Sequence, residues 1–147
     1  MNAVISPAAV VVRRTIAATA EQLFDAWLDP EALAEWMRPG TIQKTEARVD
    51  PRVGGAYEII MHGDADPIPH RGVYRVIDRP RRLVFTWNSP YAGANDSLVT
   101  VDFQLVGKST EVIITHERLP EASMAGHTKG WTGALERLDE TAQQGRL

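Results

Sequence analysis

The sequence predicts an α+β fold in which a long antiparallel sheet packs against a long C-terminal helix. Three observations support this prediction. Apolar residues recur with a period of two from Thr41 to His116. The segments between these runs are short and rich in Gly, Pro, Asp and Asn. After Pro120 the apolar residues step by three and four, as they do on one face of a helix. One strand and two short helices precede the sheet, so the order of elements is that of an α+β domain.

The composition is typical of one globular domain. The chain has 147 residues, 44% of them hydrophobic and 24% charged, which predicts a single domain over 1–147 with its core over 10–144. The net charge of −3 provides no positive potential for a phosphate backbone, so we expect no nucleic-acid partner. Without cysteine there are no disulfides, thiolate nucleophiles or cysteine-ligated metals.

No run approaches the roughly 20 apolar residues of a membrane span. The N-terminal apolar run also lacks the preceding basic region of a signal peptide. We therefore expect a cytoplasmic protein that does not enter a membrane.

The first elements are a strand and two helices. Residues 10–16 alternate between an apolar and a mixed face, as a half-buried strand does. Thr19 and Gln22 have the spacing of a capping box, and apolar residues then recur at helical spacing: Ala20, Leu23, Phe24, Trp27 and Leu28. Pro30 ends this helix and fits the first turn of a second one, which ends before Pro39 and carries Leu33, Trp36 and Met37.

Six further strands follow from the period of two. They are predicted over Ile42–Val49, Ala56–His62, Gly72–Ile77, Leu83–Trp87, Leu98–Val106 and Glu111–His116. Turn-forming residues separate them over 50–55, 63–69, 78–81, 89–96 and 107–109. These connections are too short for parallel crossovers, so the sheet is predicted to be an antiparallel meander.

The last element is the most clearly amphipathic helix in the chain, predicted over Glu121–Gln144. Its apolar face carries Met124, His127, Trp131, Leu135 and Leu138. At about 1.5 Å per residue it is roughly 36 Å long, enough to span the sheet. Gly126, Gly130 and Gly133 each disfavour a helix by about 1 kcal/mol. They therefore indicate either close approach of backbone or ligand, or a loose helix end.

Several local motifs have the order and spacing of a known family. They are Phe24-Asp25-Ala26-Trp27, Asp29-Pro30-Glu31, Trp36, Arg52, Gly54-Gly55, Arg82-Leu83-Val84-Phe85-Thr86-Trp87, and Gly130-Trp131 with Leu135 and Leu138. Together they resemble the Bet v 1-like or START-related (SRPBCC) superfamily, specifically the domain related to the activator of Hsp90 ATPase, over nearly the whole chain. The resemblance implies a helix-grip fold: a curved sheet around the terminal helix. It also implies a cavity between them that related proteins use for hydrophobic or amphipathic small molecules.

Strand alternation independently predicts which side chains face the terminal helix. The inward positions are Tyr57, Ile59, Met61, Leu83, Phe85, Trp87, Val99, Val101, Phe103, Leu105, Val112, Ile114 and His116. A mostly apolar space with a few polar groups is typical of a small-molecule site, although a packed core has the same composition. The candidate ligand-binding residues are Trp36, Tyr57, Ile59, Met61, Tyr74, Phe85, Trp87, Val101, Phe103, Ile114, His116, Met124, His127 and Trp131.

The sequence favours ligand binding over catalysis. A catalytic interpretation would use His116 or His127 as general base or acid, with Tyr57 or Tyr74 polarising a carbonyl, but no carboxylate is spaced to orient either imidazole. The histidines also lack metal-ligand spacing, so no metal is expected.

We therefore predict a domain that binds a hydrophobic or amphipathic small molecule and has no cofactor. An enzyme of cyclase or dehydratase type and a protein-binding or co-chaperone-like module are the alternatives. The protein is expected to be a monomer or a homodimer.

Overall fold

The computed structural model describes residues 9–93 and 96–147, which form a curved sheet around a long helix. The strands are β1 (Val10–Ile16), β2 (Lys44–Val49), β3 (Ala56–His62), β4 (Ile68–Asp78), β5 (Arg82–Trp87), β6 (Ser97–Val106) and β7 (Ser109–Glu117). They form one antiparallel sheet in the order β1-β7-β6-β5-β4-β3-β2. The helices are α1 (Ala20–Leu28), α2 (Pro30–Trp36) and α3 (Met124–Gln143), and a 3-10 turn, η1 (Glu121–Ser123), precedes α3. The α+β class and the helix-grip arrangement are confirmed.

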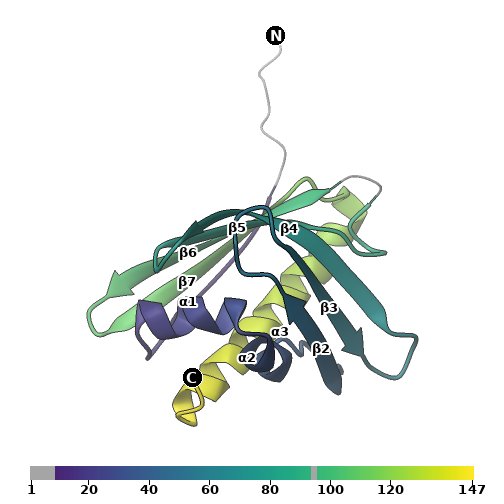
Figure 1. The fold of residues 1–147 in the computed structure, drawn as a ribbon. Coiled ribbons are helices and arrows are strands. Elements are labelled where there is room, and N and C mark those ends of the chain that lie inside the picture. Colours follow the sequence, from purple (N-terminus) through teal and green to yellow (C-terminus); the bar gives the residue numbers. More distant parts are fainter. Residues whose placement is uncertain (1–8, 94–95) are drawn as a thin grey trace.

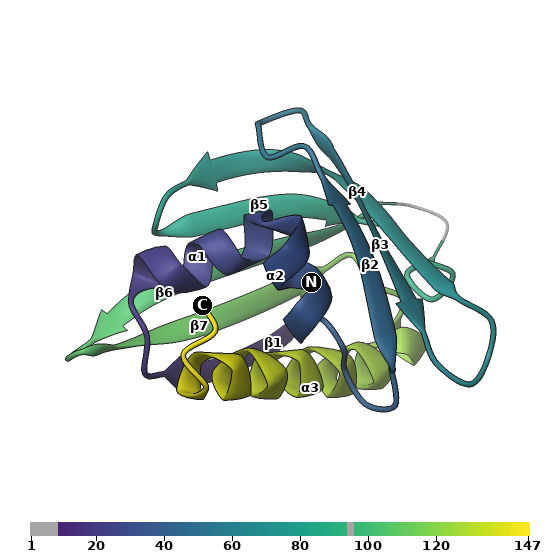
Figure 2. The same ribbon diagram turned by 60° about the horizontal axis from the view of Figure 1, so that its bottom comes forward.

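The sheet curls so that both of its halves face α3 (Figure 1). In Figure 2, β2, β3 and β4 run at a steep angle to β5, β6 and β7, and α3 lies along the concave side. The pairing of β4 with β5 shifts register between Tyr74 and Val76. Such a bulge bends a strand and increases its twist, which accounts for the change of direction at this point of the sheet.

The two short helices begin at the capping residues that the sequence indicates. The Thr19 side chain accepts from the Gln22 amide at 3.1 Å, and the Gln22 side chain accepts from the Thr19 amide at 3.1 Å. Asp29 accepts from the Glu31 amide at 3.0 Å and so caps α2, with Pro30 in its first turn. The predicted capping box and the predicted place of Pro30 in the first turn of the second helix are confirmed.

The concave face of the sheet, α1, α2 and α3 share one hydrophobic core. Its largest fully buried side chains include Phe24 and Trp36 from the short helices and Leu135 and Leu138 from α3. Trp131 is 3% exposed and packs against Trp87 of β5, with the ring centroids 5.0 Å apart. This contact between helix and sheet is the one that the predicted fold requires.

One of the predicted inward-facing positions is wrong. Leu105 was expected on the concave face, but its side chain is 75% exposed. It pairs with Thr110 in the β6–β7 hairpin, close to the turn. In Figure 2 the tip of this hairpin extends past the end of α1 and beyond α3. The alternation of the strand is preserved, but none of the described helices lies opposite its last residues.

The remaining differences concern boundaries. β4 begins at Ile68, four residues before the predicted strand, and the regular α-helix begins at Met124 because residues 121–123 form the 3-10 turn. The predicted turn over 89–96 includes residues 94 and 95, which lie outside the described residues. In the described part of the chain, no helix combines the length and the apolar character needed to cross a membrane.

Candidate functional site

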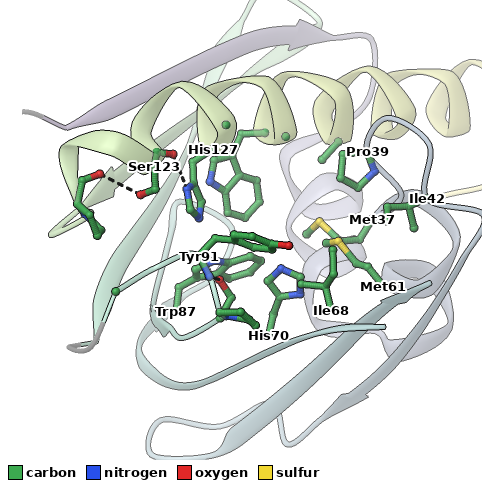
Figure 3. Close-up of a pocket in the computed structure, with 18 of the residues that line it drawn as sticks. Met37, Pro39, Ile42, Met61, Ile68, His70, Trp87, Tyr91, Ser123 and His127 are labelled. Atoms are coloured by element: carbon green, nitrogen blue, oxygen red, sulfur yellow. Dashed lines mark hydrogen bonds between the residues drawn. The ribbon is translucent and has the colours of Figure 1, made fainter. Parts of the chain in front are cut away.

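A cavity of about 640 Å³ lies between the N-terminal half of α3 and the β2–β5 side of the sheet. Figure 3 shows its walls: α3 on one side, and on the other the loop after α2 and the strands that carry Met61, His70 and Trp87. Its lining is Met37, Pro39, Ile42, Met61, Ile68, His70, Trp87, Ser89, Pro90, Tyr91, Gly93, Pro120, Ala122, Ser123, Gly126, His127, Gly130, Trp131 and Ala134. No Lys, Arg, Asp or Glu is among these residues. The cavity is therefore apolar with a few neutral polar groups, as small-molecule sites are.

The glycines of α3 help to make this space. A Cβ atom built on Gly126 or Gly130 would have no atom within 4 Å, so each glycine borders open volume. Gly133 is different, because its Cβ would lie 3.4 Å from the backbone of Pro39 and Gly40. The sequence left two explanations for these glycines. Close backbone approach applies to Gly133, whereas Gly126 and Gly130 line the cavity.

Four tryptophans form a continuous row beside and beneath the cavity. The ring centroids of Trp36 and Trp27 are 4.7 Å apart, those of Trp27 and Trp131 are 6.0 Å apart, and those of Trp131 and Trp87 are 5.0 Å apart. Trp87 and Trp131 line the cavity itself. Each of these two rings is only 3% exposed, so a bound molecule would touch a small part of one ring on the sheet side and of one on the helix side.

His116 is held by a chain of hydrogen bonds across three strands and α3. The Trp131 indole donates to His116 Nδ1 at 3.0 Å. Since an indole can only donate, Nδ1 is the acceptor, and the proton of the neutral ring is on Nε2. Nε2 then donates to Ser97 Oγ at 2.8 Å, and the Ser97 hydroxyl donates to the Trp87 carbonyl at 2.5 Å. Both ring nitrogens are engaged, which leaves neither of them free for proton transfer.

Burial sets the charge state of this imidazole. The His116 side chain is fully buried, and burial lowers its pKa to about 3, with a smaller contribution from nearby His127. The ring is therefore neutral near pH 7. His116 therefore has the environment of a hydrogen-bonded core histidine.

His70 and His127 face the cavity from opposite walls. His127 Nδ1 donates to the Ser123 carbonyl at 2.8 Å within the first turn of α3. His70 Nδ1 donates to the Ile59 carbonyl at 3.3 Å across the β3–β4 pair, and its ring packs on Trp87 with centroids 4.7 Å apart. Burial lowers the pKa of His70 to about 4, so its ring is also neutral near pH 7.

The two predicted tyrosines lie outside the cavity. The Tyr57 hydroxyl donates to the Thr86 carbonyl at 2.6 Å, and burial raises the pKa of both Tyr57 and Tyr74 well above the ordinary value. The Tyr57 ring passes Gly72, where an added Cβ would lie 1.9 Å from the Thr86 carbonyl oxygen and 2.6 Å from the Tyr57 ring. Gly72 is thus required by close backbone packing of β4 on β5.

Behind the cavity a second, much smaller void of about 10 Å³ lies among aromatic rings. Its lining includes Trp27 and Trp87, whose indole N–H groups are buried and have no hydrogen-bond partner among the described residues. Such a volume matches about one water molecule. The described residues contain no cluster of three or more His, Cys, Asp or Glu side chains that could hold a metal ion.

Sequence comparison gives the family. The family model described as "Activator of Hsp90 ATPase homolog 1-like protein" matches residues 17–143, which is most of the chain. The chain belongs to this family. The resemblance inferred from the local motifs is thereby confirmed. Among curated proteins, none matches this member of the family.

Solved structures share the fold of this chain. Protein CV1439 from Chromobacterium violaceum is 25% identical with a TM-score of 0.79, over 90% of this chain and 94% of that one. CalU16 from Micromonospora echinospora is 24% identical with a TM-score of 0.67, over 88% of this chain and 73% of CalU16. DynU16, a protein of the dynemicin biosynthetic locus, is 16% identical with a TM-score of 0.76, over 93% of this chain and 48% of DynU16. The last two similarities concern the fold alone.

The fourteen candidate residues fall into three groups in this family member. Four line the main cavity: Met61, Trp87, His127 and Trp131. Four others, together with Trp87, line the small void: Tyr57, Ile59, Tyr74 and Phe85. Six contribute to neither: Trp36, Val101, Phe103, Ile114, His116 and Met124. Five of these six are buried, and Met124 is half-buried at the start of α3. Ligand contact by any of the fourteen stays a prediction.

Most of the cavity lining was not singled out from the sequence. His70 was missed because Pro69 was interpreted as part of a turn, whereas β4 begins at Ile68. The alternation of Ile68, His70 and Gly72 was the available signal. Tyr91 and Pro120 lie in irregular segments, where no periodicity relates sequence position to the direction of a side chain.

Proposed function

We propose that this protein binds a hydrophobic or amphipathic small molecule in the cavity between the sheet and α3. The observation that carries the proposal is the cavity itself. Its volume of about 640 Å³ falls in the range of roughly 300–1,000 Å³ that small-molecule sites occupy. Its lining is mostly apolar, and none of the described residues in it is a Lys, Arg, Asp or Glu.

The arrangement of the walls supports the same proposal. In a tightly packed interior, side chains fill the available volume to crystal-like density. Here two glycines of α3 border empty space, although alanine at either position would favour the helix by about 1 kcal/mol. Gly130 is half-buried and Gly126 is exposed, and the absence of side chains at both positions leaves volume free at the expense of helix stability. A cytoplasmic location and a monomeric or homodimeric state stay part of the prediction.

The experiment uses N-phenyl-1-naphthylamine, an apolar probe whose fluorescence rises in a dry site. The wild-type protein should bind it with a saturable signal and should melt at a higher temperature as the probe concentration rises. A variant with Gly126→Leu and Gly130→Leu places two aliphatic side chains in the cavity and should weaken probe binding by about tenfold or more.

The matched control is Ala125→Leu, which adds a leucine at an exposed position of α3 that does not line the cavity. It should bind the probe like the wild type. Thermal melting without probe establishes that each variant is folded. Absence of saturable binding to the wild type, or equal binding by the cavity variant and the control, would refute the proposal.

A further inference from the structure

Two imidazoles supply the cavity with hydrogen-bonding groups of one kind. His127 projects from α3 and His70 from β4, and Figure 3 shows both directed towards the space that Trp87 and Tyr91 border. Each Nδ1 faces a backbone carbonyl, that of Ser123 for His127 and that of Ile59 for His70. A carbonyl oxygen only accepts, so each Nδ1 carries the proton. In the neutral ring, Nε2 is then left with a bare lone pair.

Both Nε2 atoms are without a donor in the part of the chain that the structure describes. Among the described residues, the hydrogen bonds of these two rings are made at Nδ1, and the Ile68 carbonyl is a second backbone acceptor beside the His70 ring. Neither Nε2 atom is fully buried. Among the described residues, the side-chain nitrogens that are fully buried and lack a partner are the indole nitrogens of Trp27 and Trp87. His70 is only 7% exposed, and the surface that it retains lies against the cavity.

His116 shows what the fold does with a histidine that faces no ligand. Its ring centroid is 5.0 Å from that of His127, yet both of its nitrogens have protein partners, the Trp131 indole and the Ser97 hydroxyl. The free acceptors of His70 and His127 are therefore not a general feature of imidazoles in this interior. They occur at the two histidines that line the cavity.

The other polar groups of the cavity do not select between donors and acceptors. The hydroxyl groups of Ser89 and Tyr91 can either donate or accept. The Ser123 hydroxyl already donates to the Pro120 carbonyl at 2.9 Å. Among the described residues that line the cavity there is no lysine or arginine to attract an anion. The two Nε2 atoms can only accept, so a bound molecule can satisfy them only by donating a hydrogen bond.

We propose that the cavity selects apolar ring molecules that carry a hydrogen-bond donor, such as a phenolic or alcoholic hydroxyl, and that His70 and His127 determine this selectivity. The inference rests on the proposed binding function and names its ligand class. Water can donate to Nε2 in the empty cavity, and a molecule that displaces this water without donating leaves a buried acceptor unpaired. A hydroxyl replaces the hydrogen bond, whereas an ether or a carboxylate of similar shape does not.

The experiment compares three probes of nearly equal shape at pH 7.5 by titration calorimetry: 2-naphthol, 2-methoxynaphthalene and 2-naphthoate. The wild type should bind 2-naphthol about tenfold more tightly than 2-methoxynaphthalene, since one net hydrogen bond is worth about that factor. The acceptor-only anion 2-naphthoate should bind most weakly. His70→Phe and His127→Phe keep a flat ring without nitrogen, and each should reduce the preference for 2-naphthol.

The control variant is His62→Phe, which changes a histidine of β3 that does not line the cavity and should keep the wild-type preference. A measurement on the unmodified protein complements the variants. With ¹⁵N-labelled histidine, His70 and His127 should show the Nδ1–H tautomer at pH 7.5. Their Nε2 resonances should move with 2-naphthol and not with 2-methoxynaphthalene.

The outcomes separate the two proposals. If both neutral probes bind equally well, if 2-naphthoate binds most tightly, or if the two rings show the Nε2–H tautomer, the ligand class is wrong while the binding function stands. If neither these probes nor N-phenyl-1-naphthylamine binds, both proposals fail.

Discussion

Mild acid should destabilise this protein through two buried neutral histidines. The pKa of His116 is lowered to about 3 and that of His70 to about 4, mainly by burial, from an ordinary value of 6.5. Between these values the unfolded chain binds more protons than the folded protein. The contribution of both groups to stability is therefore complete above pH 6.5 and is lost as the pH falls towards their folded pKa values.

The size of the effect follows from the two shifts. At pH 5 both histidines are still mostly neutral in the folded state, whereas both are mostly protonated in the unfolded chain. Each should then lower the free energy of unfolding by about 2 kcal/mol relative to pH 7.5, or about 4 kcal/mol together. Domains of this kind are stable by roughly 5–15 kcal/mol, so the loss is a large fraction of the total.

Urea unfolding followed by tryptophan fluorescence at pH 7.5, 6.5, 5.5 and 5.0 measures this dependence. His116→Gln is the informative variant, because a glutamine amide can accept from Trp131 and donate to Ser97 without titrating. It should lose about half of the wild-type pH dependence, and His70→Gln should lose the other half. The pKa of Asp25 is lowered by its hydrogen bonds to Arg79, so this surface carboxylate titrates below the range of the experiment.

The reasoning would be refuted if His116→Gln kept the full pH dependence of the wild type. It would also be refuted by a wild-type stability that is equal at pH 7.5 and 5.0. Either result would mean that His116 is protonated in the folded state at pH 5, and that the chain from Trp131 to the Trp87 carbonyl does not hold it neutral.

Two further pairs of substitutions test the packing. Trp131→Phe leaves His116 Nδ1 without its donor, whereas Trp87→Phe removes an N–H that is already unpaired. In urea unfolding at pH 7.5, Trp131→Phe should therefore lower the free energy of unfolding by about 1–3 kcal/mol more than Trp87→Phe. Equal losses would contradict the hydrogen-bond assignment. Gly72→Ala creates a backbone clash and should lower the free energy of unfolding by several kcal/mol, whereas Gly126→Ala should raise it by about 1 kcal/mol. A tolerated Gly72→Ala would show that β4 and β5 can separate without cost.

The fold could be predicted because the signals for its strands and helices lie in short stretches of sequence. The period of two from Thr41 to His116 marks the strands, and the capping box at Thr19 and Gln22 fixes the start of α1 within the sequence itself. The same is true of the helical spacing of His127 and Trp131, which places both on the inner face of α3 and correctly brings them to the cavity.

The cavity could be predicted only in part because its shape depends on non-local packing. Phe103 and Trp87 are both inward residues of the sheet, yet Phe103 packs on Phe24 at 5.3 Å and fills space while Trp87 borders a void. The alternation of a strand gives the face of each residue but not the distance to the helix opposite. The hydrogen bond to His116 Nδ1 likewise comes from Trp131, 15 residues later in the chain. No sequence pattern relates these two positions.

The row of four tryptophans has a spectroscopic consequence. All tryptophans of the chain belong to it, with neighbouring rings 4.7 to 6.0 Å apart. At such separations excitation energy migrates between indoles faster than it is emitted, so the four rings behave as one chromophore. A molecule that quenches Trp87 at the cavity wall should therefore also reduce the fluorescence of Trp36, which has no exposed surface. The near-ultraviolet circular dichroism of the folded protein should show the paired bands of coupled transitions, and these should change shape when the cavity fills.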